Sequence, residues 1–149
     1  MGINSTYNEK SLFDSFDADK RELINKSIQQ IFNLGKSAVD VALSKGNYIN
    51  RSGILRSSIG CGVSFEGVVK EVYGFRSILQ GDRGAFQGKL LLDELLKENP
   101  TKGQIKLVVI AGAQHASFVE NISRFTVLED ANNYIHSNME IILSQLNFI

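Results

Sequence analysis

Apolar residues recur at three- and four-residue steps in three stretches of the chain, a spacing that places them on one face of an α-helix. The first predicted helix follows Asp17 or Asp19, either of which is a suitable N-cap residue, and runs from about Lys20 to Gly46. The second ends before Pro100, because proline disfavours helical geometry in the residue ahead of it. The third runs from about Glu129 to Leu146. The apolar positions of the second helix are Phe86, Leu90, Leu91, Leu95 and Leu96.

Two stretches between the first and second helices show the apolar and polar alternation of half-buried strands, imperfectly from Leu55 to Val63 and more clearly from Val68 to Tyr73. Glu66 and Gly67 supply a tight turn between them, so the sequence predicts a β-hairpin from about Ser57 to Gly74. Gly60 and Gly62 lie inside the first of these strands. Paired glycines in a strand indicate either a bulge or the close approach of another backbone.

A later strand is predicted from Gln104 to Ala111, where Val108, Val109 and Ile110 are adjacent. Consecutive β-branched residues are typical of a strand that is covered on both faces, and we expect this strand to be the central one. The segment from Phe75 to Arg83, between the hairpin and the second helix, has neither a strand period nor a helix period and is expected to be a loop.

These elements predict an α+β fold in which long N-terminal and C-terminal helices pack on a small, mainly antiparallel sheet, with an extra helix between strands. We expect residues 1–19 to form an N-terminal arm and residues 20–149 to form a single domain. A chain of 149 residues is long enough to bury roughly two thirds of the surface that its unfolded form exposes.

Composition narrows the classes of partner. Sixteen basic residues balance sixteen acidic ones, so no overall field draws the protein to nucleic acid or to an anionic membrane. Cys61 is the only cysteine, which excludes an intrachain disulfide and fits a reducing compartment. The segment from Met1 to Lys10 lacks the apolar core of a signal peptide. We therefore expect the chain to reside in the cytoplasm.

Few residues point to catalysis. Cys61 and His115 are the candidate nucleophile and base of a small hydrolase or transferase, but nothing in their spacing supports the pairing. The two histidines lie far apart in sequence and show no metal-ligand spacing. The glycines around Gly84 lack the strand and the Lys-Ser/Thr pair of a phosphate loop. We expect no enzyme, no cofactor and no metal.

One loose concentration of basic residues lies in the hairpin and the loop after it. Its simplest interpretation is a solubilising rim. If identical subunits formed a ring, the same residues repeated by symmetry would make a nonspecific contact with DNA in a channel. The residues concerned are Arg51, Arg56, Lys70, Arg76 and Arg83.

Two short segments resemble signatures of a known family. Residues Ser52 to Ile59 read Ser-Gly-Ile-Leu-Arg-Ser-Ser-Ile, similar to the Thr/Ser-Gly-x-Leu-Arg-x-Ser-Ile signature of the head-to-tail joining, or tail-completion, proteins of long-tailed phages. Residues Gly112 to Glu120 resemble that family's second signature, Gly-Ala-x-Tyr-Ala-x-Tyr-Val-Glu, with His115 at the first tyrosine position. The order of the predicted elements is similar as well.

The resemblance implies a structural virion protein, a ring-forming component of the connector between the portal vertex and the tail. Its expected partners are copies of itself, portal, adaptor or other neck proteins, and tail proteins, with no membrane. It would reside in the virion at the junction of neck and tail, and in the host cytoplasm during assembly. The alternatives are the small hydrolase or transferase described above and a monomeric binding module.

The residues that carry these expectations fall into two groups. The candidate assembly motif comprises Ser52, Gly53, Leu55, Arg56, Ile59, Gly112, Ala113, Val119 and Glu120. Within it, Leu55 and Ile59 are expected to face the core, and Gly112 to let another backbone approach a strand end. The second group is apolar and lies in the predicted loop, where we expect it to reach a neighbouring subunit. It comprises Phe75, Ile78 and Leu79.

Overall fold

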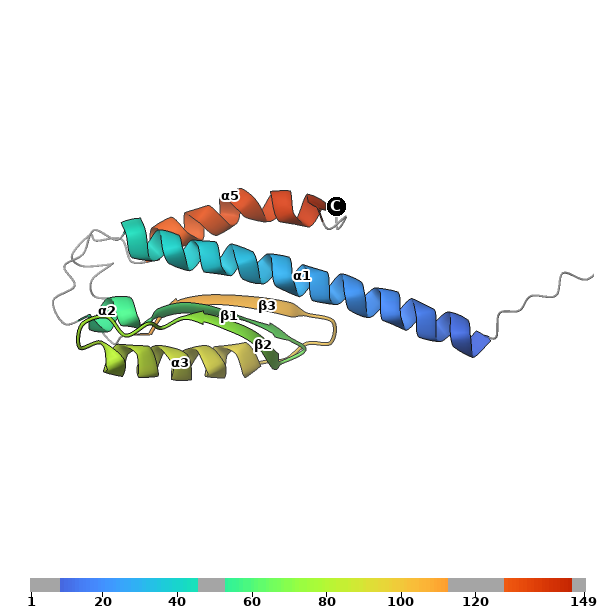
Figure 1. The fold of residues 1–149 in the computed structure, drawn as a ribbon, viewed down its shortest axis with the longest axis horizontal. Helices are drawn as coiled ribbons and strands as arrows, with labels where there is room; N and C mark the ends of the chain where they lie inside the picture. Colours follow the sequence, from blue (N-terminus) through green and yellow to red (C-terminus); the bar gives the residue numbers. More distant parts are fainter. Residues whose placement is uncertain (1–8, 46–52, 113–127, 146–149) are drawn as a thin grey trace, which may run out of the picture.

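The computed structural model describes residues 9–45, 53–112 and 128–145. Two helices cover one face of a three-stranded antiparallel sheet and a third covers the other face, so the fold is α+β as expected (Figure 1). In chain order the elements are α1 (Glu9–Lys45), α2 (Ile54–Ser57), β1 (Ile59–Phe65), β2 (Val68–Gly74), α3 (Asp82–Lys97), β3 (Ile105–Ala111) and α5 (Glu129–Gln145).

The predicted hairpin is confirmed, and β1 and β2 are its strands. Glu66 and Gly67 form the turn, with φ of 52° and 81°. Two successive positive φ values match the twist of a right-handed hairpin, which is why a glycine follows the acidic residue. The hairpin has a register shift between Val63 and Ser64. The bulge is therefore not at the paired glycines.

The order of the sheet is β2-β1-β3, so β1 is central and β3 lies at an edge. The prediction that β3 is the central strand is wrong. A run of apolar residues indicates that both faces of a strand are covered. It does not indicate which strands pair with its two edges, and that pairing sets the strand order. Both faces of β3 are packed, against α1 on one side and α3 on the other, but only one of its edges is paired within the described residues.

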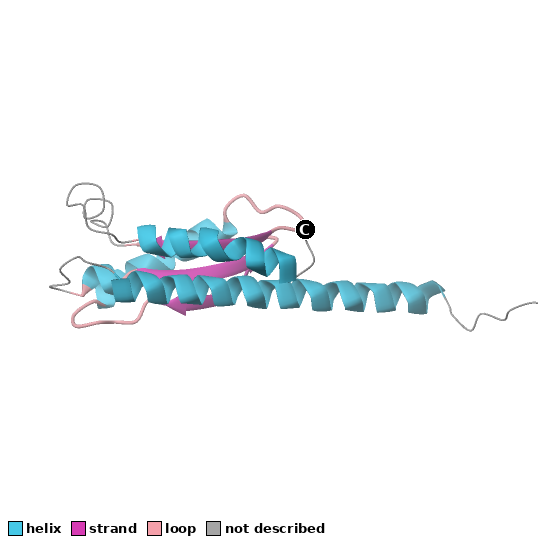
Figure 2. Ribbon diagram, turned by 90° about the horizontal axis from the view of Figure 1, so that it is seen from above, coloured by secondary structure: helices cyan, strands magenta, loops and turns pink. Residues whose placement is uncertain are grey.

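Helix α1 begins at Glu9 and not near Lys20, so Asp17 and Asp19 lie inside it and do not cap it. The apolar period marked only the part of the helix that packs on the sheet. Its 37 residues span about 55 Å, whereas a seven-residue strand spans about 23 Å. The N-terminal part of α1 consequently extends past the sheet (Figures 1 and 2). The helix also crosses the expected boundary at residue 19, although the division into arm and domain stays a prediction.

The two faces of the central strand β1 carry side chains of very different size. Ile59, Cys61 and Val63 are fully buried in the core cluster that includes α1 residues. Gly60 and Gly62 face the other way. A Cβ atom at Gly60 would lie 2.4 Å from the Phe75 ring, and one at Gly62 would lie 2.7 Å from a methyl carbon of Leu96 in α3. The paired glycines thus admit the side chains of a closely packed helix and its preceding loop.

The sheet-facing side of α3 differs from the one that its large apolar residues predicted. Its buried positions include Gly84, Ala85 and Gly88, together with Leu92 and Leu96. Because these small residues bring the helix axis close to the sheet, they decide which face turns inward. Of the predicted apolar positions, Phe86 and Leu90 are exposed and Leu91 is partly exposed, whereas Leu96 is buried.

We expect Gly60→Ala to lower the free energy of unfolding by about 1–3 kcal/mol, since the added methyl group overpacks the Phe75 ring. Combining it with Phe75→Leu, which withdraws ring atoms from that methyl group, should cost less than the sum of the two single substitutions. Urea unfolding of the wild type, the two single variants and the double variant tests this prediction. Additive losses would show that the two sites are not in contact.

Candidate functional site

The structure brings the first motif segment and the Phe75–Arg83 loop together. The Ile78 N–H donates a hydrogen bond to the Ser57 hydroxyl oxygen at 2.8 Å. Gly53, with φ of 76°, lies so close that a Cβ atom there would be 1.8 Å from the Ile78 carbonyl oxygen. Ser57 is fully buried. The motif therefore anchors the loop inside its own chain.

The three apolar residues of this loop have different environments. Phe75 is 4% exposed and belongs to the core cluster between the sheet and α3, so it is occupied within its own subunit. Ile78 is half-buried. Leu79 is 71% exposed and has a positive φ of 56°. Of the expected contact residues, Leu79 is the one that presents its side chain to solvent.

Other residues of the first motif serve the intramolecular core. Leu55 and Ile59 are buried, as expected. Arg56 is half-buried, and its Nη1 donates to the Leu43 carbonyl oxygen at 2.9 Å. A cation at this position satisfies one of the last carbonyl groups of α1 and complements the negative end of the helix dipole. Arg56 is therefore engaged within its own chain, unlike the exposed basic residues of the predicted DNA contact.

The remaining basic residues of that set, Lys70, Arg76 and Arg83, are exposed. They do not converge on one described cavity, and the Arg76 guanidinium lies 5.7 Å from the centre of the Tyr73 ring. Arg51 is outside the described residues.

Much of the second motif also lies outside the described residues. Ser52 of the first motif, and Ala113, His115, Val119 and Glu120 of the second, are not described. Gly112 is described, and a Cβ atom there would lie 2.5 Å from the Cα of Gly88 in α3. The expectation that Gly112 lets another backbone approach is confirmed.

Cys61 has the environment of a packing residue. It is fully buried, and its Sγ lies 3.1 Å from where a Cβ atom of Gly35 in α1 would be. Burial, with a smaller contribution from the charge of Asp40, raises the thiol pKa from 9.0 to about 12. A nucleophilic thiol needs the reverse, a lowered pKa and access to substrate. Within the described ranges there is also no group of three His, Cys, Asp or Glu side chains able to hold a metal ion.

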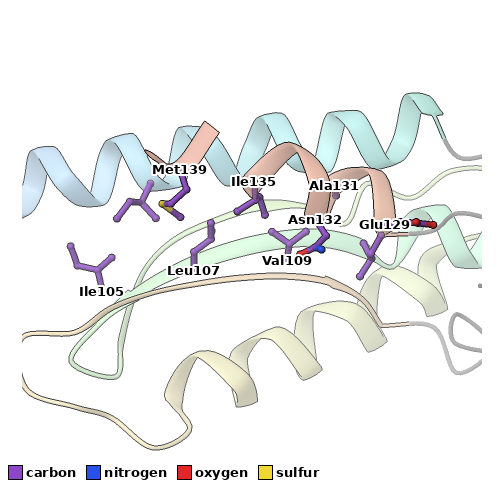
Figure 3. Close-up of a pocket in the computed structure, with 10 residues that line it drawn as sticks. Ile105, Leu107, Val109, Glu129, Ala131, Asn132, Ile135 and Met139 are labelled. Carbon is purple, nitrogen blue, oxygen red and sulfur yellow. The ribbon is translucent and has the colours of Figure 1, made fainter. Parts of the chain in front are cut away.

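A mostly apolar groove of about 660 Å³ lies between α5 and β3, beside Ile31 of α1, and we call it the β3 groove. In Figure 3 the side chains of β3 point up toward those of α5. Its lining is mostly aliphatic, with Glu129 and Asn132 at the rim. The residues that define it are Ile105, Leu107 and Val109 from β3, Leu128 just before α5, and Ile135 and Met139 from α5.

The free edge of β3 borders this groove. The Gly112 N–H donates to the Ser58 carbonyl, and the Gln104 carbonyl accepts from the Glu66 N–H, so even-numbered residues of β3 direct their backbone groups toward β1. In an antiparallel ladder these directions alternate. The N–H and C=O groups of Leu107 and Val109 therefore point away from β1, where no other described strand pairs with them.

A second uncovered apolar surface lies on the far side of the sheet. Phe86 and Leu90 of α3 are 64% and 57% exposed and, being four residues apart, lie on the same face of the helix. We call this pair the α3 ridge. Sequence reasoning placed both residues on the apolar face of the predicted helix. The small residues Gly84, Ala85 and Gly88 were the signal that the opposite face packs on the sheet.

Comparisons with known proteins leave these surfaces without a precedent. The chain matches no protein-family model, and no curated protein or solved structure is significantly similar to it. None of the described helices combines the length and the apolarity that a membrane crossing requires.

Replacing Ser57 with alanine should lower the free energy of unfolding by about 1–3 kcal/mol, because the Ile78 N–H loses its partner in a buried setting. Ser77 lies in the same loop, and its hydroxyl donates a hydrogen bond to the Asp82 carboxylate in an exposed setting; because water can replace that bond, Ser77→Ala should cost less than about 0.5 kcal/mol. Chemical denaturation of both variants measures the difference. Equal losses would mean that Ser57 does not anchor the loop.

The thiol of Cys61 should react slowly with a maleimide at pH 8 in the native protein and rapidly in denaturant, because burial and its raised pKa keep it protonated and inaccessible. Mass spectrometry over time measures the extent of labelling. Rapid labelling of the folded protein would revive the interpretation of Cys61 as a nucleophile.

Proposed function

We propose that this protein is a structural subunit that associates with copies of itself into a closed ring, as part of the connector between head and tail of a long-tailed phage. The observation that carries the self-association is that the described residues leave two different apolar surfaces uncovered, the β3 groove and the α3 ridge. They lie on opposite sides of the sheet (Figure 1).

Two different surfaces on one subunit are what head-to-tail association requires. Each copy offers one surface to the copy before it and the other to the copy after it, and the series closes into a ring when the rotation between copies divides a full turn. Contiguous apolar surface that remains exposed on a monomer favours unwanted association. A ring covers both surfaces on every subunit.

The location at a phage neck rests on the two sequence motifs and on the order of the elements. The order of the elements agrees with the order that the resemblance implies: a long first helix, a hairpin preceded by the Leu55-Arg56 segment, and a closing helix. Portal, adaptor or other neck proteins and tail proteins would then cover the two ends of the ring.

Fewer observations support the competing functions. A hydrolase or transferase that uses Cys61 would need the thiol to reach a substrate, and Cys61 is fully buried. A monomeric binding module would use the same apolar surfaces for a different protein. The state of association of the purified chain separates that module from a ring subunit.

Electron microscopy and native mass spectrometry of the purified protein should show rings whose mass is an integral multiple of 16.5 kDa. Leu79→Asp should reduce ring formation, because it places a charge on an exposed apolar side chain beside the start of α3. The adjacent exposed Gln80 provides a matched control, and Gln80→Asp should leave the rings intact. A wild-type protein that stays monomeric at high concentration contradicts the proposal.

A further inference from the structure

The two uncovered apolar surfaces differ in shape, since the β3 groove is concave and the α3 ridge projects from a helix. We propose that the α3 ridge of one copy lies in the β3 groove of the next copy, with Phe86 and Leu90 as its anchors. This pairing rests on the proposed self-association and specifies which surfaces meet. A helix that inserts residues at i and i+4 into an apolar groove is a common mode of protein recognition.

The charged residues that flank the ridge are as far apart as the two ends of the groove. The groove is lined from Leu128, just before α5, to Met139, a separation of eleven residues, or about 16 Å of helix. On α3 the ridge is flanked by Arg83 and Glu94, also eleven residues apart and therefore about 16 Å. The charged ends of the ridge would thus reach the two ends of the groove.

The charges at those ends are complementary in one direction. Glu129 lines the groove where α5 begins. At the opposite end of the groove, Ile105 also lines an adjoining cavity. That cavity is lined by three basic and two acidic residues, so it has a net positive charge. The ridge has Arg83 at its first end and Glu94 at its second. The charged residues of the adjoining cavity are Lys20, Arg21, Lys102, Asp17 and Glu66.

This complementarity fixes the orientation of the incoming helix. With α3 parallel to α5, Arg83 of one copy approaches Glu129 of the next, and Glu94 approaches Lys102. The reverse orientation brings like charges together at both ends, which costs association free energy. Asp93 and Lys97 form an ion pair within α3 at 2.9 Å, so that pair contributes little to the choice.

Shape also favours ridge-to-groove contact over contact between like surfaces. Two convex ridges would touch along a line, and two facing grooves would enclose a void, and each arrangement forfeits packing contacts. Because the ridge lies below the sheet and the groove above it (Figures 1 and 3), ridge-to-groove contact is head-to-tail.

Cross-linking between two marked chains tests the pairing directly. Leu90→Cys and Met139→Cys are prepared separately, mixed so that subunits exchange, and treated with a short bis-maleimide; Cys61 is buried and provides no competing thiol. We expect dimers that join the two different variants, with little cross-linking in either variant alone. Efficient cross-linking between two Leu90→Cys chains, or between two Met139→Cys chains, would overturn the head-to-tail arrangement.

A charge exchange tests the orientation. Glu94→Lys should weaken self-association about tenfold, and adding Lys102→Glu to the same chain should restore it, since every interface would then contain the swapped pair. Glu71 is an exposed glutamate outside both surfaces, so Glu71→Lys makes the same change in net charge and should have little effect. Analytical ultracentrifugation measures all four proteins.

The results separate this pairing from the proposed function. Rings that form without a link between positions 90 and 139 and without rescue by the charge exchange would overturn the pairing and leave self-association standing. A strictly monomeric wild-type protein would overturn both.

Discussion

The fold depends on a central strand that is packed tightly on both faces but with different partners. On one face of β1, Ile59, Cys61 and Val63 supply the side chains that meet α1. On the other face, Gly60 and Gly62 supply none, and the Phe75 ring and the α3 leucines occupy the space instead. This asymmetry places α3 close to the sheet through its own small residues. As a consequence, Phe86 and Leu90 are left on the outside of the molecule.

A second constraint acts at the end of the hairpin where α2 meets the loop before α3. The contacts of Gly53 and Ser57 with Ile78 hold that loop in place, and Arg56 binds the end of α1. The first sequence motif is thus explained by structure within one subunit, where it joins the two layers of helices. Its residues position the loop that carries Leu79 without themselves forming the outer surface.

The described residues leave apolar surface exposed on opposite sides of the sheet. Strand β3 ends the described sheet with backbone groups directed outward, beside a groove that α5 only partly closes. Burying such surfaces against an identical subunit removes apolar area from water on both partners, which drives association. Cys61, in contrast, is committed to packing by its burial and raised pKa.

The sequence by itself determined the type and order of the three long helices and the three strands, the hairpin turn at Glu66 and Gly67, and the burial of Leu55 and Ile59, because periodicity and turn geometry are local properties. It did not mark the single turn of helix α2. It did not determine that β1 lies between β2 and β3, nor which face of α3 turns inward. Those outcomes depend on how closely two elements approach, and the glycines that permit the approach, such as Gly88 and Gly112, are far apart in sequence. The groove and the ridge follow from that packing, since each is formed by what the close contacts leave uncovered.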